Sequence, residues 1–450
     1  MMLPSETTLR SAAPSVADPG PKIIVEQLVI AGGTLVDMHP PRMGPADILI
    51  EGDTIVRVGG PMPETAPRVD ASGCFVTPAF VVAHTHLYMT LATGMPPPPS
   101  TPRTLADHLQ WVWWTLDKAL DDDLVHTSAL VGAAAAAKAG AAFVVDLHSS
   151  PRAIDGSLDR IEAALEEVGV RGILAYETSD REGRGRRDAA LKENRRFLEK
   201  VRAGQTKHRA LAGAHAMMSL NDDTLDALRE LADQFAVGIH MHVAEDATDQ
   251  MDAERNRKTT LEKRIEHLGI ARAGSVVAHG NQLAAAQIDA LMSAGATIVT
   301  NPRSNMIHGL ARLGAGGARI ALGTDGIDGD VLAEAHAHYL RHSEARDNLA
   351  RETGMRIAAG QELAGSTSRI VPGARANLTI LDYQPVTPMT PSNLVDHVGR
   401  ALSSAHVRDT MVDGRFVVRE KKLVSLDERE LVLCVRSVAS RLWERMQGYH

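Results

Sequence analysis

The chain has 450 residues, of which 44% are apolar and 23% are charged, and its formal net charge is −8. These values are typical of a large globular protein, and the negative charge argues against a nucleic acid or an anionic membrane as partner. Cys74 and Cys434 are the two cysteines, so no disulfide framework is implied and we expect a reducing, cytoplasmic compartment. No apolar run approaches the ~18 residues of a membrane span.

Both ends of the chain differ from its middle in composition and in predicted secondary structure. Residues 1–22 are rich in Pro, Ser and Ala and have no apolar signal-peptide core, so we expect a disordered leader. Short strand-like pieces separated by Gly-Gly and Gly-Asp turns occupy 23–75 and return in 371–425. They predict one small β-sandwich domain built from both chain ends. Residues 426–450 are expected to form a C-terminal helix.

The middle of the chain, 76–370, alternates apolar strand-like runs with amphipathic helical stretches that open on Asp or Ser and close on Gly. This alternation is typical of βα units on a parallel sheet. Eight such units predict an α/β fold with a (β/α)₈ TIM-type barrel. The strand candidates are 80–84, 142–148, 172–177, 210–215, 237–242, 275–279, 297–300 and 320–325.

Polar side chains that can bind metals or carry protons end most of these strands. The active sites of such barrels lie at the C-terminal ends of the strands. A chance distribution of 19 histidines would not place one at the ends of five strands. The residues at these ends are His84, His86, His148, Glu177, His215, His242, His279 and Asp325.

The sequence predicts one divalent metal ion, bound by His84, His86, His242 and Asp325. His84 and His86 are two residues apart and so point to the same side of their strand. Imidazole and carboxylate groups suit zinc, which we expect here, and they also suit iron or manganese. A single histidine is more often a hydrogen-bonded core or surface residue, but the ordered set favours a metal centre.

Two other His-x-His pairs have different interpretations. His336 and His338 lie in a helix-like stretch, where residues two apart do not share a face, so we expect packing or surface roles. His240 lies one pleat further from the strand end than His242 and is interpreted as a core residue or a support for a ligand.

Glu245 follows His242 by three residues and could move a proton between water and a leaving group. The alternative for Glu245 is a solvated loop acid.

The substrate pocket is predicted less sharply. Trp113 belongs to a tryptophan cluster, with Trp111 and Trp114, that could stack on a ring or belong to the core or a subunit interface. Arg303 ends the seventh strand and could bind a substrate carboxylate or carbonyl, or form a structural ion pair. His148 and Glu177 have no assigned role. The stiff loop 95–104 could form a wall or a lid.

Several motifs resemble those of the amidohydrolase superfamily, in its cytosine-deaminase and chlorohydrolase-like branch. They are PAFVVAHTH (78–86), HVAE (242–245), VVAHG (276–280), NPRSN (301–305) and LGTDG (322–326). Within that branch, stretches such as LQWVWWTLDKAL and SSPRAIDGSLDRI are similar to SsnA-type aminohydrolases. The resemblance runs from about residue 24 to the C-terminus.

This resemblance implies roles for the site residues, one by one. The four proposed ligands match the family's metal ligands, and Asp325 would also accept the proton of the attacking water. Glu245 matches the general acid/base, His279 the histidine that orients the water, and His215 a substrate contact. Strand 4 has no lysine at its end, which favours a single metal. The chain departs from the family pattern at Val82, in TDGIDGD and in HAMMS, so the familiar substrates do not follow.

Three functions are compatible with these residues. The first is a deaminase that releases ammonia from an amino-substituted nitrogen heterocycle, a small-molecule substrate. The second is a hydrolase of a cyclic amide or a ring–halogen bond at the same metal site. The third is a non-catalytic metal-binding scaffold, against which the presence of Glu245 and His279 argues. The family resemblance also implies a homodimer, with the C-terminal helix as a candidate contact.

Overall fold

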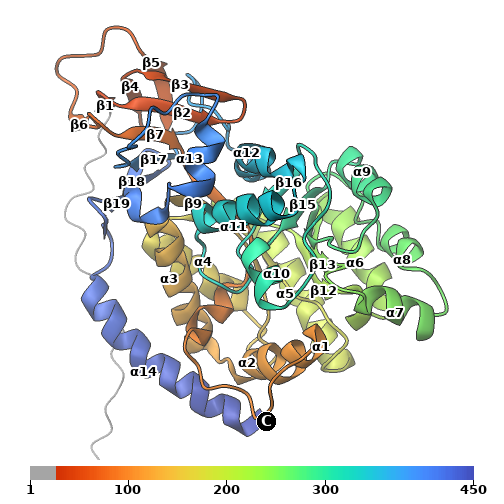
Figure 1. Cartoon of the computed structure of the whole chain (residues 1–450). Helices are drawn as coiled ribbons and strands as arrows, with labels where there is room; N and C mark the ends of the chain where they lie inside the picture. The colour runs from red at the N-terminus through yellow and green to blue at the C-terminus, as the bar shows by residue number, and fades with distance from the viewer. Residues whose placement is uncertain (1–26, 450) are drawn as a thin grey trace, which may run out of the picture.

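The computed structural model describes residues 27–449, and the expected leader at 1–22 lies outside this range. A central body of parallel strands and surrounding helices carries a set of mixed sheets at one end (Figure 1). Each of the eight strand candidates in the middle of the chain overlaps an observed strand, and the candidate 210–215 covers parts of two, β11 (Arg209–Ala210) and β12 (Ala212–Ala216). Parallel sheets flanked by helices confirm the α/β, TIM-type prediction at this level.

The mixed sheets combine strands from both ends of the chain. Pairing of β7 with β17, with Thr77 opposite Thr379, joins the N-terminal strands to the C-terminal ones. Apolar side chains from the two sheets share one buried cluster that includes Ile50, Val76 and Ile380. One sheet has the order β5-β4-β1-β6 and the other β20-β19-β18-β17-β7-β2-β3. The strands are β1 Gln27–Ala31, β2 Thr34–Met38, β3 Pro41–Pro45, β4 Ile48–Glu51, β5 Thr54–Val58, β6 Arg68–Asp70, β7 Phe75–Pro78, β17 Leu378–Leu381, β18 Val407–Val412, β19 Arg415–Arg419 and β20 Lys422–Leu423.

The strands of the central body form two parallel sheets, in the orders β11-β10-β9-β8 and β12-β13-β14-β15-β16. Isolated parallel bridges link the sheets at both edges, Thr85 with Asp325 and Thr178 with Ala214. All strand ends that carry candidate site residues therefore face one side. The strands are β8 Phe80–Thr85, β9 Ala141–His148, β10 Arg171–Tyr176, β11 Arg209–Ala210, β12 Ala212–Ala216, β13 Ile239–Val243, β14 Val276–His279, β15 Thr297–Thr300 and β16 Ile320–Leu322.

Helices cover the outer face of these strands. The expected caps are present: the Asp121 side chain accepts from Leu124 N at the start of α3, and the left-handed Gly169 ends α4. The α5 helix carries many charged residues, which leave it only a narrow apolar face. The helices are α1 Leu105–His108, α2 Trp114–Ala119, α3 Asp122–Lys138, α4 Ser157–Val168, α5 Arg184–Arg202, α6 Asp222–Phe235, α7 Thr248–Arg255, α8 Leu261–Leu268, α9 Ala285–Ser293, α10 Pro302–Ile307, α11 Val331–Glu344, α12 Thr353–Leu363, α13 Leu394–Arg400 and α14 Glu428–Met446.

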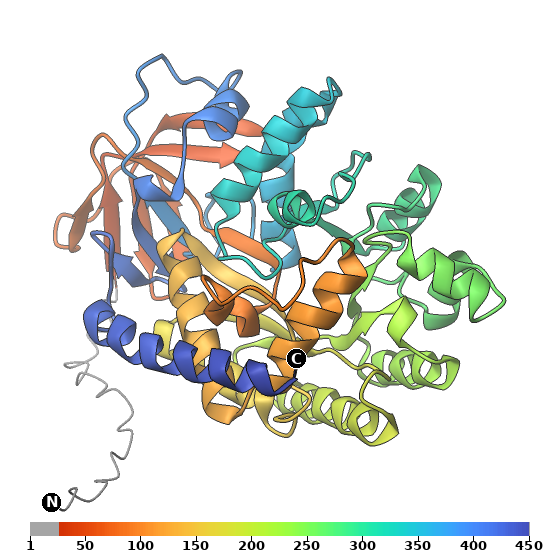
Figure 2. The same ribbon diagram turned by 60° about the horizontal axis from the view of Figure 1, so that its bottom comes forward.

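The last helix, α14, lies along the outside of α2 and α3 (Figure 2). Trp443 Nε1 donates to Leu91 O at 2.9 Å, and Arg445 Nε donates to Ala119 O at 2.6 Å. These bonds tie the end of the chain to the segment that follows His86 and to the end of α2. Across 27–449, no helix has both the length and the apolar character needed to cross a membrane.

Gly213 lies where the two parallel sheets meet, and a side chain there has no room. A Cβ atom on Gly213 would come 2.2 Å from Tyr176 O, and Thr178 N donates to Gly213 O. We expect Gly213→Ala to destabilise the fold by about 1–3 kcal/mol through backbone displacement. The melting temperature measures this effect. Gly185→Ala is the matched control, because that helical position has open space around it and alanine favours helices. Equal melting temperatures for the two variants would contradict the prediction.

His208 predicts an acid-sensitive contribution to stability. Its Nδ1 accepts from Gly172 N at 2.9 Å, and burial lowers its pKa to about 4. Between pH 6.5 and 4 the unfolded chain binds a proton at this residue and the folded chain does not, so stability falls as the pH falls. The loss in unfolding free energy from this residue between pH 6.5 and 4 is about 3 kcal/mol. We expect His208→Asn, which keeps an acceptor, to flatten the pH dependence of the unfolding free energy in this window. Identical pH profiles of the unfolding free energy for the wild type and His208→Asn would contradict this prediction.

Candidate active site

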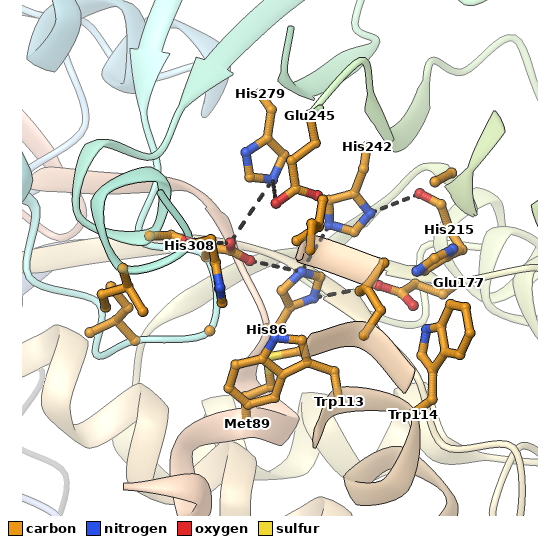
Figure 3. A pocket seen from close by; sticks show the side chains of 18 of the residues that line it. His86, Met89, Trp113, Trp114, Glu177, His215, His242, Glu245, His279 and His308 are labelled. Carbon is orange, nitrogen blue, oxygen red and sulfur yellow. Dashed lines mark hydrogen bonds and ion pairs between the residues drawn. The ribbon is translucent and has the colours of Figure 1, made fainter. Parts of the chain in front are cut away.

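Four predicted ligands converge at the C-terminal ends of the parallel strands. His84 lies in β8, His86 just after it, His242 in β13, and Asp325 three residues after β16. One nitrogen or oxygen atom from each lies within 4.8 Å of all the others. Figure 3 shows His86 and His242 facing each other, with Glu245 and His279 beside them. The structure therefore brings together residues that are up to 241 positions apart in the chain.

Hydrogen bonds to backbone carbonyls fix which nitrogen of each ring faces the centre. His86 Nδ1 donates to Leu147 O at 2.6 Å, and His242 Nδ1 donates to His215 O at 2.8 Å. A carbonyl only accepts, so each Nδ1 carries the proton. Burial lowers the pKa of His242 well below its usual value, which keeps that ring neutral. The Nε2 atoms of the two rings then lie 3.0 Å apart at the centre of the cluster.

This arrangement fits a bound cation. Two nitrogen atoms at this distance cannot both present lone pairs, so a positive charge, either a proton or a metal ion, lies between them. The buried His84 Nε2 has no hydrogen-bond partner, although it points toward Asp325 Oδ1 at 3.7 Å. Burial opposes protonation of His86, but Asp325 and Glu177 outweigh it and raise its pKa to about 9, so the cluster attracts positive charge. Three imidazoles and one carboxylate form a suitable donor set for a divalent metal ion.

His240 supports the cluster from behind. Its Nε2 lies 2.9 Å from His84 Nδ1, and both rings are fully buried. When His84 Nδ1 donates to His240, the His84 Nε2 lone pair is directed to the centre, as with the other two rings. The sequence left open whether His240 is a core residue or a support, and its contact with His84 favours the second role. His338, by contrast, is buried against Thr353 on α12, away from the cluster.

Asp325 has contacts on both carboxylate oxygens. Its Oδ1 lies 3.2 Å from His86 Nε2, and Ser304 Oγ donates to Oδ2 at 2.5 Å. Burial opposes ionisation, but His84 and His86 hold the pKa of this carboxyl well below its usual range. Asp325 and His279 both have a left-handed backbone, with φ of 52° and 70°. Such conformations carry strain and gather at functional sites.

Glu245 and His279 form a second group beside the ligands. His279 Nε2 lies 3.7 Å from Glu245 Oε1, and its Nδ1 lies 3.2 Å from Asn305 Oδ1. Asn281 bridges Asn305 and the backbone carbonyl of Glu245, so the group is held together. Burial and the charge of Asp325 raise the pKa of Glu245 well above its usual value. Glu245 therefore has the protonated form that a general acid needs.

A cavity of about 220 Å³ opens onto this cluster. Its walls away from the cluster are largely apolar, and among residues 27–449 no lysine or arginine lines it. Leu109 and Trp113 belong to a π-helical turn between α1 and α2, a distortion that is common at functional sites. The lining residues are His86, Tyr88, Met89, Ala92, Thr93, Leu105, Leu109, Trp113, Trp114, Glu177, His215, Ala216, Met218, His242, Glu245, His279, Ser304, Ile307, His308, Asp325, Gly326 and Ile327.

The three predicted substrate contacts differ in whether they line the cavity. Trp113 and His215 line the cavity, whereas Arg303 does not. The Arg303 guanidinium binds Asp328, with 2.5 Å between Nη2 and Oδ1, and Glu334 at 2.7 Å. Its two negative partners satisfy the guanidinium, so the substrate-binding interpretation of Arg303 is corrected to the structural ion pair.

Some cavity residues were not found by sequence reasoning. Tyr88 and Met89 directly follow the His-x-His motif in a short 3₁₀ turn, and His308 follows the NPRSN motif. Their closeness in the sequence to those motifs was the signal that could have identified them as cavity residues. Met218 offered none, because its place depends on the loop after β12. Glu177, which the sequence left without a role, lines the cavity. His148 instead contacts Ser150 at 2.8 Å and does not line it.

Comparison with known proteins decides the family. A family model described as "Amidohydrolase family" matches residues 75–417. The chain belongs to the amidohydrolase family. This amidohydrolase is 26% identical over 408 residues to a 5-methylthioadenosine/S-adenosylhomocysteine deaminase of Thermococcus sibiricus, covering 87% of this chain and 94% of the relative. It is 26% identical over 437 residues to a 5'-deoxyadenosine deaminase of Methanothermobacter thermautotrophicus, covering 93% and 99%.

A solved structure agrees with this membership at the level of the fold. An adenosine deaminase from Xanthomonas campestris with bound zinc superposes with a TM-score of 0.78 at 21% identity, covering 92% of this amidohydrolase and 98% of that chain. Nearly the full length of both proteins therefore shares one architecture. The mixed sheets built from both chain ends belong to the shared part, since the match extends well beyond the central parallel strands.

The ligand cluster predicts how metal content responds to substitution. We expect His242→Ala to lose the bound divalent metal almost completely, because it removes one of four converging donors. Metal per chain, measured by mass spectrometry on purified protein, checks this outcome. His336→Ala is the matched control, since His336 belongs to a His-x-His pair on α11 outside the cluster, and it should retain the wild-type metal content. Equal metal content in the two variants would contradict the site.

Proposed function

We propose that this amidohydrolase is a metal-dependent aminohydrolase that releases ammonia from an amino-substituted nitrogen heterocycle. The observation that carries the proposal is one cavity in which two groups meet. One is the His84–His86–His242–Asp325 cluster, and the other is Glu245, a buried acid with a raised pKa. Hydrolytic deamination needs a nucleophilic water at neutral pH and a nearby proton donor, and this cavity offers groups for both.

The residues of the chain divide the chemistry between them. A bound divalent ion supplies a water of lowered pKa as the nucleophile. Asp325, ionised and held by Ser304, accepts the proton that this water gives up. Glu245 donates its proton to the ring nitrogen beside the attacked carbon and regains one from the hydroxyl of the intermediate as the carbonyl forms. The proton that Asp325 accepted goes to the leaving amino group, which departs as ammonia. His279 donates through Nδ1 to Asn305 Oδ1, so its Nε2 accepts a hydrogen bond and orients the attacking water.

The lining of the cavity supports a flat, uncharged ring as substrate. Trp113 and Met89 offer apolar surface for such a ring, and the absence of lysine and arginine from the lining disfavours a phosphate group. The two relatives named above are deaminases of adenosine derivatives. Derivatives of 6-aminopurine are therefore the first compounds to test.

The other two candidate functions have weaker support. Hydrolysis of a cyclic amide or of a ring–halogen bond would use the same cluster, but no residue of the cavity favours those leaving groups over ammonia. A non-catalytic scaffold would not need a proton donor such as Glu245 in contact with His279. Release of ammonia, of chloride or of neither distinguishes the three functions directly.

Several finer features complete the proposal. We infer zinc as the metal because the structural relative from Xanthomonas campestris carries it and the donor set suits it. The bridges at both edges of the two parallel sheets support a closed (β/α)₈ barrel over 76–370. The mixed sheets support a β-sandwich domain over 23–75 and 371–425, followed by the C-terminal helix. A homodimer is inferred from the family resemblance. A cytoplasmic location is inferred from the free cysteines Cys74 and Cys434.

Substitution of Glu245 tests the catalytic assignment. We expect Glu245→Gln to lower the rate of ammonia release by about 100- to 10,000-fold, because the amide cannot donate and regain the proton. Metal content should stay at the wild-type level, since Glu245 is not one of the four clustered ligands. A screen of aminopurines and other amino-heterocycles with an ammonia assay measures the rates. Glu254→Gln, an exposed substitution on α7, serves as the control. Ammonia release that survives in Glu245→Gln would refute the role.

A further inference from the structure

One wall of the cavity contains a buried carboxylate that the proposed reaction does not use. Glu177 follows β10, is 3% exposed and lines the cavity beside His215 and Trp114 (Figure 3). Within residues 27–449, no donor lies within hydrogen-bond distance of its carboxylate. The nearest charged partner, His86 Nδ1, is 3.6 Å away and already donates to Leu147 O.

The neighbouring histidine presents a second acceptor. The Ser219 hydroxyl donates to Ala216 O at 2.9 Å, so its oxygen accepts from His215 Nδ1, also at 2.9 Å. With the proton on Nδ1, the lone pair of His215 Nε2 is free. His215 is 5% exposed and lines the same cavity. Two acceptors thus lie side by side on this wall.

Positive charge near this wall is neutralised by other groups. Arg181 Nη2 donates to Asp117 Oδ2 at 2.8 Å, and its guanidinium stacks on Trp114 at 4.9 Å from the ring centroid. Arg181 does not line the cavity. The Trp114 indole N–H is unpaired but fully buried, so it does not reach a ligand in the cavity. Tyr88, whose hydroxyl can donate or accept, completes the polar part of the wall.

We propose that Glu177 and His215 form a recognition site for hydrogen-bond donors on the reacting ring, so that the substrate carries a second amino group or ring N–H. This inference rests on the proposed deaminase function and names its substrate class. Glu177 lies against the same imidazole, His86, that faces the ligand cluster. A group bound there therefore lies close to the ligand cluster at which the ring is attacked. A buried acceptor left without a donor is costly, which makes such a site selective.

Matched pairs of heterocycles that differ only in NH₂ and CH₃ test this assignment. The pairs are 2,6-diaminopurine with 2-methyladenine, and 2,4-diaminopyrimidine with 4-amino-2-methylpyrimidine. A methyl group has the size of an amino group but no hydrogen to donate. Dissociation constants are measured by calorimetry on the metal-loaded full chain in the Glu245→Gln background, where turnover does not interfere. We expect the amino compound of at least one pair to bind about 10-fold more tightly.

Substitution of Glu177 assigns the preference to this residue. Glu177→Gln should reduce the amino-over-methyl preference to about twofold or less, because the amide offers one acceptor fewer and one donor more. Glu182→Gln, an exposed acid in the same loop, should leave the preference unchanged. If Glu177 is unchanged and both members of every pair bind equally, or neither binds, the assignment is overturned.

Sugar hydroxyls are the other source of donors that this wall could accept. Comparison of 5'-deoxyadenosine with 2',3',5'-trideoxyadenosine separates the two sources. A preference for the hydroxylated nucleoside that Glu177→Gln removes, combined with equal binding of the NH₂ and CH₃ pairs, would overturn a ring-bound donor. The ammonia screen remains a separate test: its failure would refute the deaminase function, whereas ammonia release without an amino preference would refute only this inference.

Discussion

The convergence of imidazole nitrogens on one point, where a positive charge must lie between them, is the constraint on which the site depends. The Nε2 atoms of His86 and His242 face each other at 3.0 Å, and each ring is held there by its Nδ1 hydrogen bond to a strand-end carbonyl. His84 completes the set against His240. The parallel strands hold these rings in place, although the facing nitrogens repel each other unless a proton or a metal ion lies between them. The folding energy of the surrounding strands therefore prepares a metal site in advance.

The groups around the cluster separate into opposite protonation states. Asp325 is held ionised by the imidazoles that face it, while Glu245, a short distance away, is held protonated by burial and by the charge of Asp325. Two carboxyl groups in one cavity thus acquire the properties of a base and of an acid. Environments that push neighbouring pKa values apart are the usual way in which enzymes assign such roles.

Segments far apart in the chain position the cavity. The turn after His86 is held by α14 through Trp443, and the π-helical turn with Trp113 supplies an apolar wall. Arginines that could have brought positive charge into the cavity, Arg181 and Arg303, are instead paired with acids. The result is a polar floor at the ligand cluster, apolar walls, and one acceptor-lined side at Glu177.

The sequence by itself determined the strands and the chemistry at their ends. Short apolar runs that alternate with helix-like stretches predicted the parallel strands, most of these runs end in His, Glu or Asp, and the side of each polar end follows from strand geometry. The positions of His84, His86, His242 and Asp325 relative to each other were therefore predictable in outline. Local patterns were sufficient here because each strand carries its own signal.

Only the tertiary structure decided which polar side chains point into the cavity and which find partners elsewhere. Arg303 lies at a strand end, yet Asp328 and Glu334 hold it outside the cavity. Glu177 lies at a strand end and does line the cavity, without a donor of its own. These outcomes depend on loops and helices whose packing is non-local. A sequence pattern records the direction of a strand residue, whereas the partners of a side chain are set by whichever distant segment folds against it.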